Sequence, residues 1–479
     1  MKKAYLLFLL AVPFISRGQE AFTLDKCIQY ALENSPTMKN SHLDEKIASA
    51  KVKETVGIGL PQIDGNVGAT NYANLPRFFG TKQRLFGFSG LPIDQYPNFY
   101  PELKDDDVLS AQNFFQLQAS ANANLTINQI IFNGSYLIGL KAASVYKDLA
   151  YKQTNQTKEQ LIQSVMKAFY AALVNRARIG LFDNNIARVD SLLKNTKALN
   201  QNGFAESIDV DRTQVTLNNL VAERDKFIKL QTLTLEILKF QMNYPMDQSL
   251  SITGELTKEA VLVNLDDYLK DWDIKNRPDY QVLEANRRLQ NLNVRNKVAN
   301  GIPSLSFNAN LGYNTQSNTI PGLFATNSPI SENPVTHIGP DKWYPMNFYG
   351  LSLRVPLFSG LQRSYQVQQE KLRLQKIENS FRTLESGIDL EVKQATIQYQ
   401  NAIETLQVQQ RNMTLATNVA NVTKIKYQQG VGSNIEVVDA ESSLRESQIN
   451  FYNALYEAFV ARTDLDKAFG RLVQIEEKN

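Results

Sequence analysis

Residues Phe115 to Asn128 read FQLQASANANLTIN, and apolar and polar side chains alternate along this whole stretch. Successive side chains of a β-strand point to opposite faces, so the stretch predicts a strand with one apolar face and one face of amides and hydroxyls. Ile63 to Thr70, Leu305 to Tyr313 and Tyr349 to Val355 alternate in the same way. Stretches of this length suit tilted strands that cross a bilayer.

Aromatic residues cluster near the ends of these four stretches, as they do in the interfacial girdles of outer-membrane strands. They are Tyr72, Phe114, Phe115, Tyr313, Tyr344 and Phe348. Alternation by itself also fits a half-exposed sheet of a soluble protein. The aromatic residues and the N-terminal segment favour the membrane interpretation.

The N-terminal segment has the features of a secretory signal peptide. Lys2 and Lys3 precede an apolar run from Tyr5 to Ile15, and Ser16-Arg17-Gly18 supplies small residues for cleavage after Gly18. The run is too short to span a bilayer as an anchor. We therefore expect residues 1–18 to be removed and the protein to be exported, with Cys27 packed in a first helix rather than lipidated.

Composition excludes several classes of protein. The chain of 479 residues carries 51 basic and 48 acidic side chains, and the signal peptide holds three of the bases and no acid. The mature chain is then neutral, which argues against nucleic acid as a partner. The single cysteine excludes a disulfide framework and a cysteine-rich zinc site. The hydrophobic content of 43% is too high for a disordered chain.

Two very long helical runs follow the second and fourth strands. Ser135 to Asn202 and Leu361 to Gln429 contain no proline, and each helix would extend on the order of 100 Å. Each run ends at a glycine, Gly203 or Gly430, where a helix-tip turn is expected. Shorter helices return over about 207–243 and 434–469. Apolar residues at 3,4 spacing predict coiled-coil packing: Ile179, Phe182, Ile186, Val189 and Leu193 in the first run, and Leu374, Ile377, Phe381, Leu384, Ile388, Val392, Ala395, Tyr399, Ala402 and Leu406 in the second.

The element order occurs twice, which predicts two tandem structural repeats. Asn34-Ser35-Pro36 corresponds to Asn276-Arg277-Pro278, and Gln201-Asn202-Gly203 corresponds to Gln428-Gln429-Gly430. The first repeat covers residues 19–250, with a strand hairpin at about 62–132 and a long helical hairpin at about 134–245. The second covers 251–479, with an equatorial segment and helices, a strand hairpin at about 303–357 and a long helical hairpin at about 359–470. The long loops 73–112 and 317–346 join the strands of each pair.

Four strands cannot close a barrel, and an open sheet edge facing lipid would leave backbone groups unpaired. The chain is therefore expected to complete a barrel with copies of itself. Three copies would give twelve strands, and the arithmetic also permits two or four copies. The predicted fold class is an α+β membrane protein, in which this β-barrel continues into a long α-helical coiled-coil barrel.

The sequence resembles the outer membrane efflux proteins of the TolC family along essentially all of the mature chain. The motifs that carry the resemblance are Ala31-x-x-Asn34-x-Pro36, Leu60-Pro61-Gln62, Phe132-Asn133-Gly134, Asn276-Arg277-Pro278-Asp279, Pro303-Ser304-Leu305, Pro356-Leu357-Phe358-Ser359-Gly360, and the run from Tyr427 to Ala440. The resemblance implies a homotrimer in the lipid of the outer membrane of a Gram-negative cell, with its helical tunnel in the periplasm. It implies a periplasmic adaptor (membrane fusion) protein and an inner-membrane transporter of the RND, ABC or MFS class as partners.

Candidate functional residues belong to a duct rather than to an enzyme. His42 and His337 have no catalytic companions, and neither a cofactor nor a metal site is expected. Gln116, Gln118, Asn122 and Asn124 would line the lumen of the barrel. The resemblance places an aperture at the helix tips, where Glu436 and Asp439 match acidic rings and Tyr427 and Asp209 match contacts that hold the aperture closed. Ser433-x-x-Glu436 is also a capping box, which explains Glu436 equally well. The best-known family member has arginine where this chain has Gly432.

The predicted function is the outer-membrane channel-tunnel of a tripartite efflux or type I secretion system, which passes drugs, small molecules or proteins to the exterior. A passive porin is the first alternative, and the long helices argue against it. A surface-anchored coiled-coil adhesin is the second, and the long proline-rich loops at the end opposite the helix tips argue against it.

Overall fold

The computed structural model describes residues 21–81, 84, 104, 106–113, 115–270, 272–325, 333–336, 339 and 342–473. The expected signal peptide, Phe114 and His337 lie outside these residues. The chain divides into two compact units. Unit 1 takes its residues from 1–51, 142–291 and 370–479, and unit 2 from 52–141 and 292–369. Each unit therefore draws on both sequence repeats.

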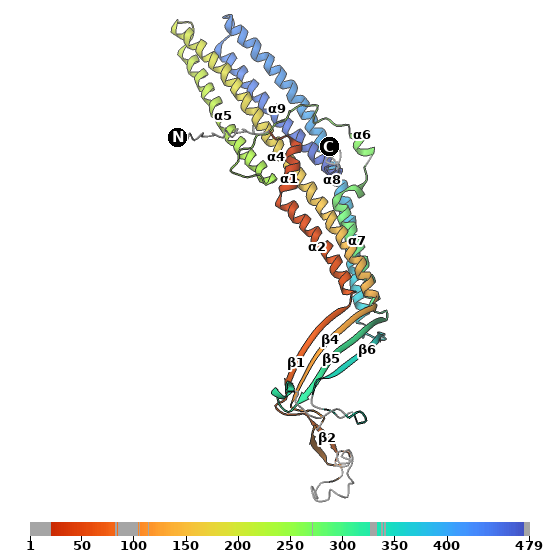
Figure 1. Ribbon diagram of the computed structural model, residues 1–479. Helices are drawn as coiled ribbons and strands as arrows, with labels where there is room; N and C mark the ends of the chain where they lie inside the picture. Colours follow the sequence, from red (N-terminus) through yellow and green to blue (C-terminus); the bar gives the residue numbers. More distant parts are fainter. Residues whose placement is uncertain are drawn as a thin grey trace, which may run out of the picture. The chain divides into compact units, whose positions relative to one another are not determined.

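The elements alternate between helices and strands along the chain (Figure 1). In order they are α1 (Leu24–Asn34), α2 (Pro36–Ile58), β1 (Gln62–Asn71), β2 (Arg77–Thr81), β3 (Val108–Gln112), β4 (Ala119–Phe132), α4 (Gly134–Gln201), α5 (Ser207–Met242), α6 (Leu265–Lys270), the 3-10 helix η2 (Ile274–Asn276), α7 (Pro278–Ala299), β5 (Ser304–Ser317), the 3-10 helix η3 (Pro321–Leu323), β6 (Tyr344–Arg354), α8 (Gln362–Gln428) and α9 (Asn434–Ala468).

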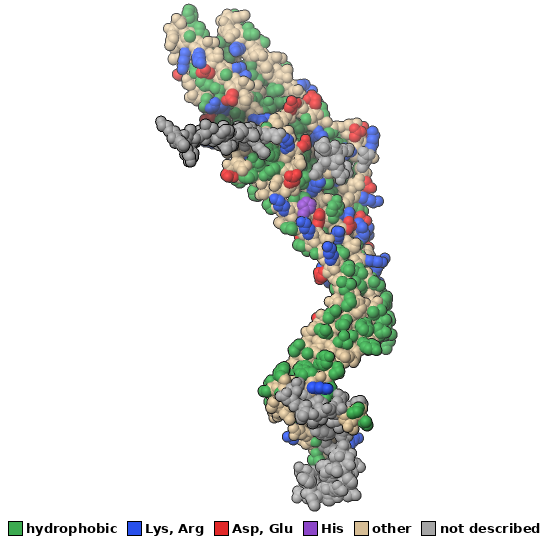
Figure 2. Space-filling model, in the orientation of Figure 1, with side chains coloured by type: hydrophobic (Ala, Val, Ile, Leu, Met, Phe, Trp, Pro, Cys, Tyr) green, Lys and Arg blue, Asp and Glu red, His purple; other side chains and the backbone are tan. Residues whose placement is uncertain are grey.

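Unit 2 is built on an antiparallel sheet in the order β1-β4-β5-β6. The register pairs Ala123 with Val67 on one side and with Tyr313 on the other, so alternate residues of all four strands share a face. One face is apolar, and its exposed members are Ile63, Val67, Leu125, Leu311, Tyr313, Tyr349, Leu351 and Leu353. In Figure 2, hydrophobic side chains gather around this unit, whereas charged side chains dot the helices of unit 1.

The opposite face of the sheet carries polar side chains that bond to one another. Asn122 Nδ2 donates to Asn124 Oδ1 at 2.9 Å, and Asn310 Nδ2 donates to Thr126 Oγ1 at 3.3 Å. These bonds run both along one strand and across to its neighbour. The alternation in the sequence therefore became a sheet with an amide-rich side and an apolar side, as predicted.

The second strand begins four residues later than the alternation suggests. Ala119 pairs with Asn71 of β1 and with Ser317 of β5, the last residue of each of these strands, and one further backbone bond runs from the Tyr72 N–H to Gln118 O at 2.7 Å. Before that point side chains accept from the backbone: Asn113 Oδ1 accepts from the Phe115 N–H at 3.0 Å, and Gln316 Oε1 accepts from the Leu117 N–H at 3.0 Å. The prediction that Gln116 and Gln118 lie in this strand was therefore wrong.

The loop predicted over 73–112 holds further regular structure. Strands β2 and β3 pair into a separate antiparallel ribbon, with Phe79 opposite Ser110. Sequence alternation did not reveal this ribbon because each strand has only five residues.

Unit 1 contains most of the long helices, which run side by side in Figure 1 as the hairpins α4–α5 and α8–α9. Their limits lie within one residue of the predicted ones. Gly203 and Gly430 in the left-handed conformation follow α4 and α8, and Asn243 in the same conformation ends α5. The predicted 3,4 stripes are buried or half-buried: Phe182 and Val189 are at most 1% exposed, and Ile388 and Leu406 at most 2%. Within the described residues, none of the helices combines the length and the hydrophobicity of a membrane-spanning segment.

Candidate gate at the tips of the helical hairpins

Both helical hairpins of unit 1 turn through the same backbone motif. Gly203 and Gly430 have φ of 78° and 77°, a region that side chains with a Cβ disfavour. The Phe204 N–H donates to Leu199 O at 2.9 Å, and the Val431 N–H donates to Lys426 O at 3.0 Å. These bonds satisfy carbonyls at the helix ends. We name residues 202–206 the first tip and residues 429–433 the second tip.

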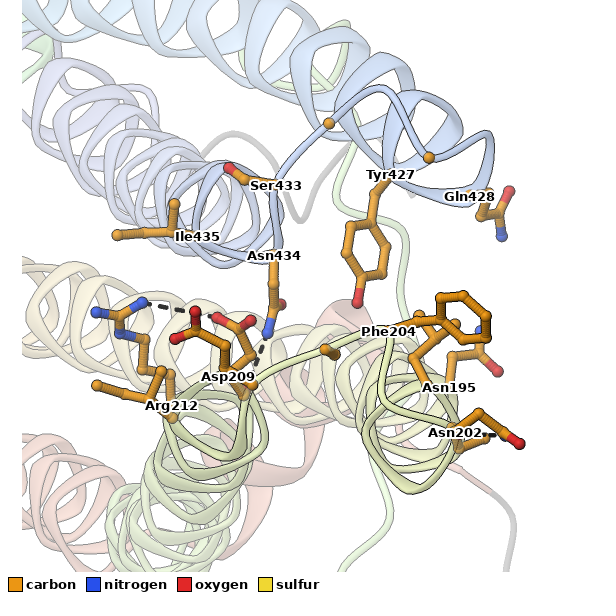
Figure 3. Close-up of a pocket in the computed structure, with 17 residues that line it drawn as sticks. Asn195, Asn202, Phe204, Asp209, Arg212, Tyr427, Gln428, Ser433, Asn434 and Ile435 are labelled. Carbon is orange, nitrogen blue, oxygen red and sulfur yellow. Dashed lines mark hydrogen bonds and ion pairs between the residues drawn. The ribbon is translucent and has the colours of Figure 1, made fainter.

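A cavity of about 1050 Å³ lies where the two tips meet, and residues of all four long helices or their turns line it. Figure 3 shows Tyr427 and Asn434 pointing from the second hairpin toward the first. Leu199, Phe204, Ile208 and Ile435 add apolar surface to the lining, and Phe204 is 81% exposed. The cavity is therefore an open, mixed surface shared by the two repeats.

Hydrogen bonds join the hairpins across this cavity. Asn434 Nδ2 donates to the backbone oxygen of Asp209 at 2.9 Å and to Thr213 Oγ1 at 3.2 Å. Asn434 is buried at the start of α9. If either bond broke while the side chain stayed buried, water could not replace the lost partner, so breaking these bonds is costly. The hydroxyls of Tyr427 and Thr196 lie 3.3 Å apart. We call the two Asn434 bonds and the contact between Tyr427 and Thr196 the tip bonds.

The predicted gate residues lie around this cavity but differ in their surroundings. Tyr427 contacts Thr196, and the backbone of Asp209 accepts from Asn434. The Asp209 carboxylate lies 3.7 Å from Arg212 Nη1, so a cation of its own helix accompanies it. Gly432 is enclosed: a Cβ there would lie 3.1 Å from Lys426 Cβ and from the Tyr427 nitrogen. A larger residue at this position would have to displace the end of α8.

Glu436 and Asp439 are exposed on the first turns of α9. The Glu436 N–H donates to Ser433 Oγ at 3.4 Å, which is one arm of the expected capping box. Within the described residues, the Glu436 carboxylate makes no return bond to Ser433, and no cation pairs with Asp439. In the internal repeat these acids occupy the places of Asp209 and Arg212. At the start of α5 a cation therefore accompanies Asp209, whereas at the start of α9 no cation pairs with Glu436 or Asp439 among the described residues.

The polar residues that connect α9 to the first hairpin were not among the predicted gate residues. Asn434, Glu441 and Gln448 recur every seven residues and alternate with the buried Val437 and Leu444. Arg188 bonds to both carboxylate oxygens of Glu441, and Asn185 Nδ2 donates to Gln448 Oε1 at 3.1 Å. Polar residues at core positions of a heptad were the available signal, because such residues need partners on the facing helix.

The remaining predicted residues have simpler environments. Asn122 and Asn124 lie on the polar face of β4, whereas Gln116 and Gln118 precede the strand. No group of three or more potential metal-ligating residues occurs among the residues that the structure describes.

Comparison with known proteins identifies the family. A family model described as outer membrane efflux protein matches residues 27–236 and 273–471. The fold is similar to that of the outer membrane protein VceC of Vibrio cholerae, with a TM-score of 0.65, 15% identity, and coverage of 93% of this chain and 96% of that chain. The CmeC outer membrane channel of Campylobacter jejuni matches with a TM-score of 0.66 and 15% identity, over 95% of this chain and 88% of that chain. The open-state MtrE outer membrane channel of Neisseria gonorrhoeae matches with a TM-score of 0.65 and 16% identity, over 93% of this chain and 88% of that chain.

Comparison with curated protein sequences gives no match. The family model nevertheless covers most of both repeats, including the two hairpin tips and the strands of the main sheet. The chain therefore belongs to the outer membrane efflux protein family.

Proposed function

We propose that three copies of this chain form an export duct, in which twelve strands close a barrel in the outer membrane and the long helices form a tunnel in the periplasm. The four-stranded sheet is the observation that carries the proposal. Its outer strands β1 and β6 are exposed along almost their whole length, and one face of the sheet is apolar. Edges of this kind cannot remain open in lipid, because their backbone groups would be unpaired.

Native mass spectrometry of the detergent-extracted protein tests the assembly. The expected result is a complex of three chains. A complex of two or four chains would overturn the trimer and keep the closed barrel, whereas a stable single chain would overturn both.

We propose that a periplasmic adaptor and an inner-membrane pump deliver cargo to this duct. The exposed apolar residues of both tips, Phe204 and Val431, support docking of a partner at this end, since large apolar side chains at the tip of a polar helical hairpin are costly in water. Deletion of the gene is expected to raise susceptibility to several unrelated drugs, with recovery on complementation. An unchanged susceptibility together with lost surface adhesion would instead support the adhesin alternative.

The porin alternative makes a different prediction for the same strain. A diffusion pore admits compounds, so its deletion lowers susceptibility, whereas loss of an export duct raises it. The direction of the change therefore separates the two functions, and the tunnel-length helices α4 and α8 favour export.

We propose that Glu436 and Asp439 form the charge filter of the aperture, and that the tip bonds hold it closed. The support is a difference between the starts of two helices: Arg212 accompanies Asp209 in α5, and among the described residues no cation pairs with Glu436 or Asp439 in α9. Three-fold symmetry would multiply these acids into rings, which favour cations over anions.

Single-channel recording in a salt gradient tests the filter. Glu436→Gln with Asp439→Asn is expected to reduce cation selectivity, and Glu457→Gln is the matched control. Glu457 is an exposed acid of the same helix, about 30 Å from the tip at the rise of an α-helix. Selectivity that stays the same in the double variant removes both acids from the filter.

A further inference from the structure

A partly buried cluster of charges lies far along the hairpins from the tips, where four segments of unit 1 meet. Arg277 precedes α7 and has a side chain only 4% exposed. Its guanidinium contacts Asp279 Oδ2 at 2.7 Å, Glu391 Oε2 of α8 at 2.8 Å and the backbone oxygen of Ala468 at 3.0 Å. Lys467 of α9 lies 3.7 Å from the other oxygen of Glu391.

These four side chains balance their charges. Arg277 and Lys467 supply two positive charges, and Asp279 and Glu391 supply two negative ones. The three guanidinium nitrogens of Arg277 bond to Asp279, to Glu391 and to the backbone oxygen of Ala468. The cluster is therefore complete as an ion-pair network without any further charge.

Glu159 of α4 adds a fifth ionisable group to this cluster. It is 4% exposed, and its Oε1 is buried without a hydrogen-bond partner. The charged groups that act on it come from each neighbouring segment: Arg277 and Asp279 from η2–α7, Glu391 from α8 and Lys467 from α9. An ionised Glu159 would be a buried charge and would make the cluster negative overall, whereas a protonated carboxyl would leave the cluster neutral.

Burial is the main reason that the pKa of Glu159 rises from its ordinary value of 4.5 to about 7. Arg277 and Lys467 favour the ionised form, and Asp279 and Glu391 oppose it, so the neighbouring charges offset one another and desolvation decides the direction. The Glu159 carboxyl therefore changes its charge near pH 7.

We propose that Glu159 is a proton-operated joint between the two helical hairpins: protonated, it holds α7, α8 and α9 together on α4, and ionised, it loosens their packing at this point. The joint requires only that α4 contributes an acid to a cluster that α7, α8 and α9 have already balanced. It does not depend on export, so it can fail while the proposed function stands.

Hydrogen exchange of the full chain in detergent tests the joint, with amide protection corrected for the intrinsic effect of pH. Between about pH 6 and about pH 8.5, protection of peptides around Arg277, Glu391 and Lys467 is expected to fall about tenfold in the wild type. Peptides around Phe182 in the same helix α4 serve as an internal control and should change little. Flat protection around the cluster would overturn the proposal.

Glu159→Gln keeps a neutral side chain of the same size at every pH, so its protection around the cluster is expected to remain flat. A second variant, Glu391→Gln, removes one of the balancing acids and is expected to move the wild-type midpoint to lower pH, because an ionised Glu159 then restores neutrality. A loss of protection with the same midpoint in all three proteins would assign the effect to another group. The infrared band of a protonated carboxyl, lost in Glu159→Gln, reports the proton directly.

Discussion

The ion pair between Arg188 of α4 and Glu441 of α9 offers the sharpest test of how the hairpins hold together. Arg188 Nη2 and Nε lie 3.1 and 3.2 Å from the carboxylate oxygens of Glu441. The Glu441 side chain is 8% exposed and that of Arg188 is 30% exposed. The carboxylate is therefore cut off from water, and the guanidinium retains some access to it.

Arg188→Met leaves Glu441 buried without its cation. Removing one partner of a buried ion pair typically costs about 3–5 kcal/mol, and we place this case at about 3 kcal/mol because water reaches the arginine side. Replacing both partners, as Arg188→Met with Glu441→Leu, removes the uncompensated charge and is expected to cost about 1 kcal/mol or less. The double variant should therefore be more stable than the first single variant.

Amide exchange of the α4 and α9 segments around the two residues measures these local free energies of opening. The expected result is a loss of protection of about two orders of magnitude in Arg188→Met, with most of it recovered in the double variant. Single-channel recording on the same proteins should show longer open times for the single variant, since the pair lies near the tips. Equal destabilisation of the single and double variants would refute the argument, because it would assign the cost to lost packing instead of to a stranded charge.

Three further predictions concern separate features of unit 1. Because the pKa of Glu159 is raised to about 7, its stabilising contribution is present below pH 4.5 and about 3 kcal/mol of it is lost as pH rises to about 7, a loss that denaturation of Glu159→Gln should not show. Gly430→Ala places a Cβ on a residue in the left-handed conformation and should lower the free energy of unfolding by about 1 kcal/mol. Gly387→Ala, at an exposed position in the middle of α8, should raise it by about 0.5–1 kcal/mol in the same denaturation assay. Burial raises the pKa of the Cys27 thiol to about 12, so a maleimide should label the folded protein very slowly at about pH 8 and the unfolded protein rapidly; rapid labelling of the folded protein would contradict the packing of α1.

Periodicity in the sequence predicted the elements well because it records which side of an element is covered. Alternation located the four strands of the main sheet, and the 3,4 stripe from Phe381 to Leu406 located the buried face of α8. Gly203 and Gly430 located both helix ends, since their φ angles suit a residue without a Cβ. The start of β4 was misplaced because a strand ends where its partners end, and the partners of Ala119 are distant in the sequence.

Pairs of polar side chains could not be predicted from the sequence either, because the two partners are distant in the sequence. Asn434 bonds to Asp209, 225 residues away, and Arg188 to Glu441, 253 residues away. Nothing in the local pattern around Glu441 or Glu159 says which cation or acid will face it. These pairings depend on the rotation and the axial register of whole helices, which packing of the apolar stripes decides.

The sequence by itself determined the duplicated order of helices and strands, the apolar face of each strand, the coiled-coil stripes and the glycine turns, because each of these follows from the period of a single segment. Only the tertiary structure decided which residues of the two hairpins line the cavity between the tips. It likewise decided that Asn434 joins the hairpins and that Glu159 is added to a cluster already balanced in charge. Charge balance and burial are properties of several segments at once, so they exist only when the helices have been brought together.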